Sequence, residues 1–319
     1  MALIPDDERT AAVFTHSRDL DGIASAAILA RYLEGQGRDV TVDFIDYTTQ
    51  DEDLERMRTL SETDIYIADF AFDEAEQYEV FDEIIVKGNR VAYWNDHHPH
   101  KDGVDEAIRR YAEIADLQGP LPYCSAEIAQ QRYLPNDAVA RKLAELAHDN
   151  DFWERNDENA NKLADIIASG YDKDKLVGHL KRGETWNPEL EQAWKAYDTE
   201  RNEAYDRLDE RAEVTQYGLT SCVISLADDM LATSDAGDHL INKCDTEMSV
   251  TLYRDGRMAF RRAEGGEVNL TEVAQLFGGG GHPYASGAHY GEDIPDDAAY
   301  ANACDIVDTK LSEYFAYGL

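Results

Sequence analysis

The feature that most constrains the fold is the alternation of short apolar segments with helical ones in the first third of the chain. The apolar segments, rich in β-branched and aromatic residues, are residues 13–15, 40–45, 64–69 and 90–94. Residues 22–33 and 72–80 have the composition of helices. This alternation predicts parallel βαβ units, whose strands are buried on both faces and whose crossovers are right-handed. We therefore expect an α/β fold with an N-terminal parallel sheet.

Polar side chains follow three of these predicted strands at the point where each strand ends. They are His16, Asp19, Asp21, Asp69 and the triplet Asp96-His97-His98. Ligands of parallel sheets bind outside the carboxyl ends of the strands, and imidazole and carboxylate groups together suit divalent transition ions. A single helix cap requires one acid, whereas residues 16–21 contain a histidine and two acids, so capping alone does not explain them. The pattern predicts a metal site at this edge.

The remainder of the chain predicts helices and then a second domain. Helical patterns cover residues 136–155, 160–168, 174–180, a long polar segment 188–214, and 296–314. Predicted strands cover 218–226, 248–253 and 257–260, the last two joined by an Asp255-Gly256 turn. Since 319 residues exceed one typical core, we expect a metal-binding domain over 1–187, a helical connector over 188–214, and a smaller α/β domain over 215–319.

Composition restricts the environment and the partners. The chain carries 66 acidic and 30 basic residues, a net charge of −36. Such an excess predicts a hydrated surface suited to a salt-loaded cytoplasm, as in a haloarchaeon, and disfavours a basic groove for duplex DNA. Four scattered cysteines indicate a reducing compartment rather than disulfides. The sequence contains neither a signal peptide nor a membrane-spanning segment, so a cytoplasmic location without a membrane partner is expected.

Together, these motifs resemble the DHH phosphoesterase family, including its archaeal nanoribonuclease and RecJ-like members. The clusters at residues 16–21, Asp69, 96–98 and 148–151 match the order of the family's N-terminal motifs. Residues 277–282, Phe-Gly-Gly-Gly-Gly-His, resemble the glycine-rich motif of the DHH-associated domain, and 258–262 resemble its arginine strand. The resemblance covers nearly the whole chain. It implies two domains facing each other across a cleft.

The resemblance also implies roles for individual residues. The implied metal ligands are His16, Asp19, Asp21, Asp69, His97 and Asp149. Asp69 would bridge two divalent ions, for which Mn²⁺ is favoured, with Mg²⁺ and Co²⁺ as alternatives. Asp151 is a rival to Asp149. Asp96 would orient a neighbouring histidine, and His98 would face the substrate.

In the C-terminal domain the resemblance implies a substrate-binding group. Its members are Arg261, Gly279, Gly280, Gly281 and His282. Because adjacent strand residues face opposite ways, only one of Arg261 and Arg262 is expected to contact the substrate, and the family pattern indicates Arg261. His100 and His148 are expected to be solvated neighbours of the motifs, and Trp186 and Trp194 to be packing residues.

The expected function is Mn²⁺-dependent hydrolysis of short single-stranded oligonucleotides or related nucleotides. Hydrolysis of cyclic dinucleotides or 3′-phosphonucleotides, exopolyphosphatase or pyrophosphatase activity, and single-strand DNA exonuclease activity are alternatives within the same family. A nucleotide-binding accessory protein without catalysis is an alternative of another class. Pyrophosphatase is disfavoured, because the C-terminal domain of pyrophosphatases in this family normally clamps the substrate with lysines, and residues 257–290 contain no lysine. The oligomeric state, the direction of attack and the pathway stay open.

Overall fold

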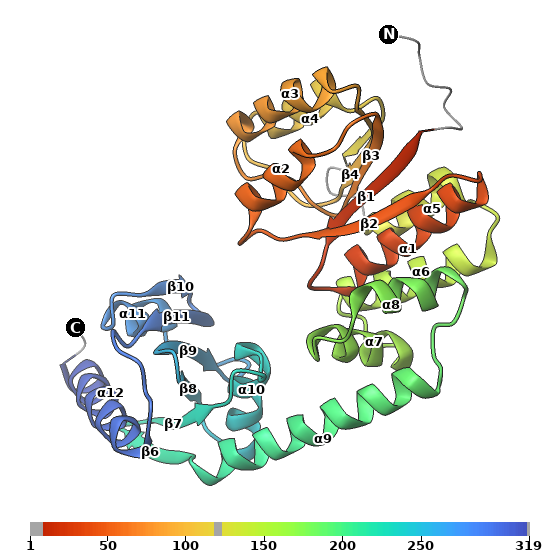
Figure 1. The fold of residues 1–319 in the computed structure, drawn as a ribbon. Helices are drawn as coiled ribbons and strands as arrows, with labels where there is room; N and C mark the ends of the chain where they lie inside the picture. The colour runs from red at the N-terminus through yellow and green to blue at the C-terminus, as the bar shows by residue number, and fades with distance from the viewer. Residues whose placement is uncertain (1–8, 118–122, 318–319) are drawn as a thin grey trace. The chain divides into compact units, whose positions relative to one another are not determined.

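The chain divides into two compact units, Met1–Tyr197 and Asp198–Leu319, each with its own β-sheet (Figure 1). The computed structural model describes residues 9–117 and 123–317. The division falls within the long helix α9 (Pro188–Glu210). Leu190, near the start of α9, packs in the core of unit 1, whereas Ala204 and Leu208 pack in the core of unit 2.

Unit 1 is built on a parallel sheet, as the sequence predicts. Its strands are β1 (Thr10–His16), β2 (Val40–Ile45), β3 (Thr63–Ala68), β4 (Arg90–Asp96) and β5 (Ala115–Leu117). They lie in the order β2-β1-β3-β4-β5, and every neighbouring pair is parallel. The predicted α/β class is therefore confirmed.

Helices cover both faces of this sheet (Figure 1). On one face, α1 (Leu20–Gly35) and α5 (Ser125–Tyr133) pack against the strands, and α6 (Ala138–Asp151), α7 (Glu158–Ala168) and α8 (Lys173–Lys181) pack on these helices in the same core. The other packs against α2 (Gln50–Arg58), α3 (Val80–Val86) and α4 (Val104–Tyr111). Val13 lies in the first core and Phe14 in the second, since successive strand side chains point to opposite faces. Two apolar faces explain why the central strands β1 and β3 lack polar alternation.

Three predicted helix boundaries are wrong, each for a local reason. The segment 72–80 begins as a loop, and a 3₁₀ turn (Ala75–Glu79) precedes α3, because Glu74 and Gln77 form a capping box. Helix α6 ends at Asp151, since residues soon after it adopt left-handed backbone conformations. Helix α9 ends at Glu210, because Glu213–Tyr217 instead pair as a strand.

Unit 2 contains a six-stranded mixed sheet in the order β10-β11-β9-β8-β7-β6. Its strands are β6 (Glu213–Tyr217), β7 (Thr220–Ala227), β8 (Met248–Tyr253), β9 (Arg257–Arg262), β10 (Gly280–His282) and β11 (Ala285–His289). Among the strand pairs described for this sheet, only β7 and β8 are parallel, and the others are antiparallel. Helix α10 (Thr233–Cys244) covers one face, and α11 (Leu270–Gln275) and α12 (Asp297–Tyr317) cover the other. Across residues 9–117 and 123–317, no helix is both long and apolar enough to span a bilayer.

Candidate metal centre

The predicted ligands converge because three adjacent strands end at one edge of the unit 1 sheet. β1 lies between β2 and β3, so the connections leaving β1 and β3 run to opposite sides of the sheet. Such a switch point opens a crevice at the carboxyl ends of the strands. His16 ends β1, Asp69 directly follows β3, and Asp96 ends β4.

Asp69 is at the centre of this group. Its side chain is 1% exposed, and neither carboxylate oxygen has a hydrogen-bond partner in the described structure. Oδ2 lies 3.9 Å from His16 Nδ1, and Oδ1 lies 3.6 Å from His97 Nε2. Its backbone is left-handed, with φ of 59°. Burial, followed by the charges of Asp21 and Asp19, raises the pKa of Asp69 well above its usual range. A buried carboxylate that accepts no hydrogen bond is suited to bind a cation, because a cation would compensate its buried charge.

His97 occupies the middle of a second set of oxygens. Its Nε2 is 3.6 Å from Asp21 Oδ2 and 3.7 Å from Asp151 Oδ2, and this buried nitrogen has no hydrogen-bond partner in the described structure. Burial and the Asp21 charge raise the pKa of Asp151 to about 6, and burial raises that of Asp21. One atom from each of Asp21, His97 and Asp151 lies within 4.8 Å of the others. This spacing fits a divalent ion with nitrogen and oxygen ligands.

The loop after β1 gives Asp19 two functions. Its Oδ1 accepts a hydrogen bond from the Gly22 N–H at 3.0 Å and so caps α1, while Oδ2 lies 2.8 Å from His16 Nδ1. Burial raises the pKa of Asp19, but the hydrogen bond and charge of His16, together with the hydrogen bond from the Gly22 N–H, outweigh burial, and the pKa is lowered. Only glycine fits at position 22, because the backbone of His16 lies so close that a Cβ there would be 2.1 Å from the His16 carbonyl oxygen. His16, Asp19 and Asp69 form a further candidate ligand group.

The structure places Asp151, rather than Asp149, beside His97. The carboxylate of Asp149 accepts hydrogen bonds from the backbone N–H groups of Asn156 and Asp157, at 2.8 and 3.2 Å. Asp149 therefore anchors the loop after α6. Both acids lie in one short motif, and only the direction of each side chain distinguishes them.

Asp96 is buried and holds two histidines. Its Oδ1 lies 2.8 Å from His98 Nδ1 and its Oδ2 lies 3.2 Å from His100 Nε2. Burial raises the pKa of Asp96, but the hydrogen bonds with His100 and His98 outweigh it and hold the pKa at about 2. The orienting position predicted for Asp96 agrees with these contacts. His98 is 43% exposed, so its ring is accessible while Nδ1 is held.

The prediction that His100 is a solvated neighbour of the motif is wrong. Its side chain is 7% exposed and its Nδ1 lies 2.6 Å from Asp105 Oδ1, at the start of α4. The sequence shows that His100 follows the triplet by two residues. It does not show that Asp105 lies beside His100, because the fold brings the two side chains together. His148 instead lies 2.7 Å from Glu127 of α5 and joins two helices. Trp186 and Trp194 pack against the unit 1 core, as expected.

In unit 2, Arg261 and His282 lie on one row of the sheet. Arg261 of β9 pairs with Ala285 of β11, which pairs with His282 of β10. Residues paired across neighbouring strands point to the same face, and two strand spacings separate this pair by roughly 10 Å. Arg261 donates to the Phe260 carbonyl at 2.9 Å, and Arg262 donates to the Val268 carbonyl at 2.8 Å.

The glycine run has a structural requirement of its own. A Cβ on Gly279 would lie 2.1 Å from the Gly287 carbonyl oxygen, and one on Gly281 would lie 2.7 Å from Ser286 Cα. These two glycines therefore permit β10 to pack closely against β11. Gly280, by contrast, has open space on its Cβ side.

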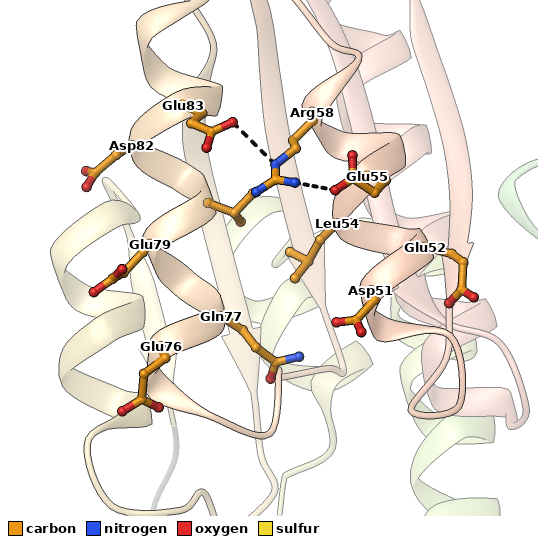
Figure 2. A pocket seen from close by; sticks show the side chains of 11 residues that line it. Asp51, Glu52, Leu54, Glu55, Arg58, Glu76, Gln77, Glu79, Asp82 and Glu83 are labelled. Carbon is orange, nitrogen blue, oxygen red and sulfur yellow. Dashed lines mark hydrogen bonds and ion pairs between the residues drawn. The ribbon is translucent and has the colours of Figure 1, made fainter.

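A groove of about 910 Å³ lies between α2 and the segment that leads into α3 (Figure 2). Its charged lining residues are seven acids and one base, Asp51, Glu52, Glu55, Glu76, Glu79, Asp82, Glu83 and Arg58. Figure 2 shows Arg58 held between Glu55 and Glu83. No residue of the candidate metal centre lines this groove. Its carboxylates would repel an anionic substrate, so we do not assign the substrate to it.

Comparisons with known proteins support the fold. No family model matches the chain, and no curated protein sequence matches it. A crystal structure of exonuclease RecJ bound to manganese aligns over 99% of this chain and 96% of that chain, with a TM-score of 0.59 and 15% identity. RecJ from Thermus thermophilus in complex with Mn²⁺ aligns over 97% of this chain, with a TM-score of 0.53 and 15% identity. This chain spans about half of that protein, 52% of its length. At these identities the likeness establishes a shared fold.

Proposed function

We propose that this chain is a metal-dependent phosphoesterase of the DHH type, which hydrolyses short single-stranded oligonucleotides or related nucleotides. The observation that carries the proposal is the buried carboxylate of Asp69, without hydrogen-bond donors, between His16 and His97. The shared fold with manganese-bound RecJ structures supports the same chemistry.

The donor set fits two divalent ions. We assign His16 and Asp19 to one ion and Asp21, His97 and Asp151 to the other. Asp69 has one oxygen facing each group and would contribute its carboxylate to both ions. Bound divalent ions supply a water of lowered pKa and neutralise charge on the phosphoryl oxygens. Oxygen and imidazole ligands without cysteine favour Mn²⁺, with Mg²⁺ and Co²⁺ as alternatives.

In this proposal, His98 of unit 1 and Arg261 and His282 of unit 2 bind the substrate. The Asp96 carboxylate holds His98 through Nδ1, so the other ring nitrogen is available to hydrogen-bond a phosphoryl oxygen. We further assign Arg261 and His282 to a substrate phosphate, because Arg261 has no carboxylate within 4.0 Å among residues 9–117 and 123–317. The guanidinium group matches a phosphate through two parallel hydrogen bonds.

The experiment is a substrate panel with Mn²⁺ at high KCl. It compares oligonucleotides of two to about twenty units with cyclic dinucleotides, 3′-phosphonucleotide, pyrophosphate and polyphosphate. We expect activity that falls as the oligonucleotide lengthens, and its loss in Asp69→Ala. The surface variant Glu52→Gln is the matched control and should retain full activity. Preference for long DNA or for polyphosphate would refute the substrate assignment. Turnover that survives Asp69→Ala would refute the metal assignment.

The panel also tests the non-enzymatic alternative. A nucleotide-binding accessory protein would bind nucleotides without hydrolysing any phosphodiester in the presence of Mn²⁺. That result would replace the proposed catalysis with binding.

A further inference from the structure

Trp153 differs from the other tryptophans of the chain in its exposure. It is 62% exposed, whereas Trp94 is fully buried and both Trp186 and Trp194 pack against the unit 1 core. Exposure of so large an apolar ring loses the stabilisation that burial would give. The chain therefore leaves one indole in solvent within the motif that also contains Asp151.

The loop that carries Trp153 is held in one conformation. Trp153 and Arg155 both have left-handed backbones, with φ of 59° and 55°. Such conformations are unfavourable for non-glycine residues and persist where the surrounding structure holds them. Asp149 supplies that restraint, since its carboxylate accepts the N–H groups of Asn156 and Asp157 and its carbonyl accepts the N–H of Glu154. The indole is therefore presented on a fixed support.

Arg155 sets the orientation of the indole. Its Cζ lies 3.7 Å from the centre of the Trp153 ring, which places the guanidinium group against one face. The exposed area of the ring consequently belongs mostly to the opposite face and the edges. Among the described residues, Arg155 has no carboxylate within 4.0 Å, although the chain contains 66 acids. Its positive charge is thus available to an anion.

The loop adjoins the candidate metal centre. Asp151, with its Oδ2 3.7 Å from His97 Nε2, precedes Trp153 by two residues. Between them, the Phe152 ring lies 6.4 Å from the His97 ring and 4.5 Å from the His148 ring. A substrate whose phosphate lies at the ligand set would therefore have its neighbouring groups beside this loop.

We propose that the free face of Trp153 is a stacking platform for a nucleobase of the substrate, with Arg155 contributing positive charge to an adjacent phosphate. This inference rests on the proposed function and names the residue that binds a nucleobase of that substrate. Every nucleobase has a π face, so stacking on an indole accepts bases without strict sequence preference. Pyrophosphate and polyphosphate have no such group and gain nothing from this platform.

The test compares Trp153→Ala and Trp153→Phe with wild type on two diesters. One is a dinucleotide, and the other is the same dinucleotide with abasic sugars in place of both nucleosides, which has no nucleobase and no aromatic ring. Loss of one stacked base predicts a KM for the dinucleotide that is about 5- to 150-fold higher in Trp153→Ala. Trp153→Phe should restore most of the affinity, and KM for the baseless diester should stay within about twofold of wild type. Val86→Ala, at a site 86% exposed on α3, is the surface control.

Equilibrium binding gives a second readout that needs neither turnover nor a variant that folds. AMP should quench the tryptophan fluorescence of the wild-type protein, and ribose 5-phosphate should not. The inference would be overturned if Trp153→Ala changed KM equally for both diesters or left KM for the dinucleotide unchanged. Equal fluorescence quenching by AMP and by ribose 5-phosphate would also overturn it. An assembly that dissociates in Trp153→Ala at unchanged KM would also overturn it, by showing that the loop contacts a second copy. Absence of all metal-dependent hydrolysis would refute the proposed function, while quenching by AMP alone would still support the platform.

Discussion

Replacement of Asp69 by asparagine should change stability in opposite directions with and without metal. Asp69→Asn retains the shape of the side chain and removes a buried charge whose two oxygens have no donors. Each unsatisfied buried polar group costs about 1–3 kcal/mol. Because the amide keeps a polar oxygen, we expect the metal-free variant to be more stable than wild type by about 1–3 kcal/mol. For a unit of this size, that corresponds to roughly 2–12 °C in Tm.

The pH dependence of this difference has a defined sign. The folded-state pKa of Asp69 is raised by burial, so the carboxyl group is protonated and tolerated at low pH. The free energy of unfolding of wild type therefore decreases as the pH rises through that raised pKa, because the charged carboxylate is then buried without hydrogen-bond donors. The advantage of Asp69→Asn over wild type should therefore grow as the pH rises. It should be smallest below the pKa of the unfolded carboxyl group.

Divalent metal should reverse the order. An ion that binds only the folded protein stabilises it by about 4.1 kcal/mol at a concentration about 1,000-fold above Kd, which exceeds the expected difference of about 1–3 kcal/mol. Wild type should gain this stability with Mn²⁺, and Asp69→Asn should gain little. Thermal unfolding with EDTA and with Mn²⁺, at several pH values and constant KCl, measures both effects. The same substitution at Asp149 is the control, since its carboxylate accepts two backbone N–H groups, and it should lose stability with or without metal.

A single pattern would refute this reasoning. If Asp69→Asn were less stable than wild type in EDTA at every pH, and Mn²⁺ shifted both proteins equally, Asp69 would be a structural acid. The bridging assignment would then fail.

Three further predictions concern other parts of the structure. Asp64→Asn should destabilise unit 1 by about 3–5 kcal/mol, because hydrogen bonds from Arg90 and Arg9 outweigh burial and lower the pKa of this buried acid; urea unfolding measures the loss, which should shrink as the pH falls through the lowered pKa. His100→Ala should reduce kcat by about 10- to 100-fold with little change in KM, since His100 holds the buried Asp96, and an unchanged kcat would exclude this role. Stability of wild type should rise with KCl between about 0.1 and 3 M, because salt screens the net charge of −36; complete folding without salt would contradict the adaptation to salt that the composition predicts.

Much of the fold could be predicted from the sequence because it depends on local patterns. The β2 and β8 segments agree with their predicted bounds, residues 40–45 and 248–253. Their β-branched residues are bounded by turn signals, and that information is contained within a few neighbouring positions. The boundaries that failed, such as the end of α6, depend on side chains that hold the following loop in a left-handed conformation.

Most residues of the candidate site could be predicted from the sequence, whereas their arrangement in space could not. Acids and histidines at strand ends indicate a metal site without further information, because parallel strands bring their carboxyl ends to one edge. The choice between Asp149 and Asp151 could not be made this way. Both lie at the end of one helix, and the backbone N–H groups of Asn156 and Asp157 engage Asp149 only once the loop is folded.

The sequence by itself determined the strands β1 to β4 and β7 to β9, the helix α1, and the kinds of side chain at the strand ends, since these follow from hydrophobic period and residue chemistry. Only the tertiary structure decided the strand order that places β1 beside β3 and leaves Asp69 without donors between His16 and His97. It also decided that His100 joins Asp96 to Asp105, and that Trp153 is exposed on a loop anchored by Asp149. These outcomes depend on contacts between distant segments and on side-chain direction, which no local pattern specifies.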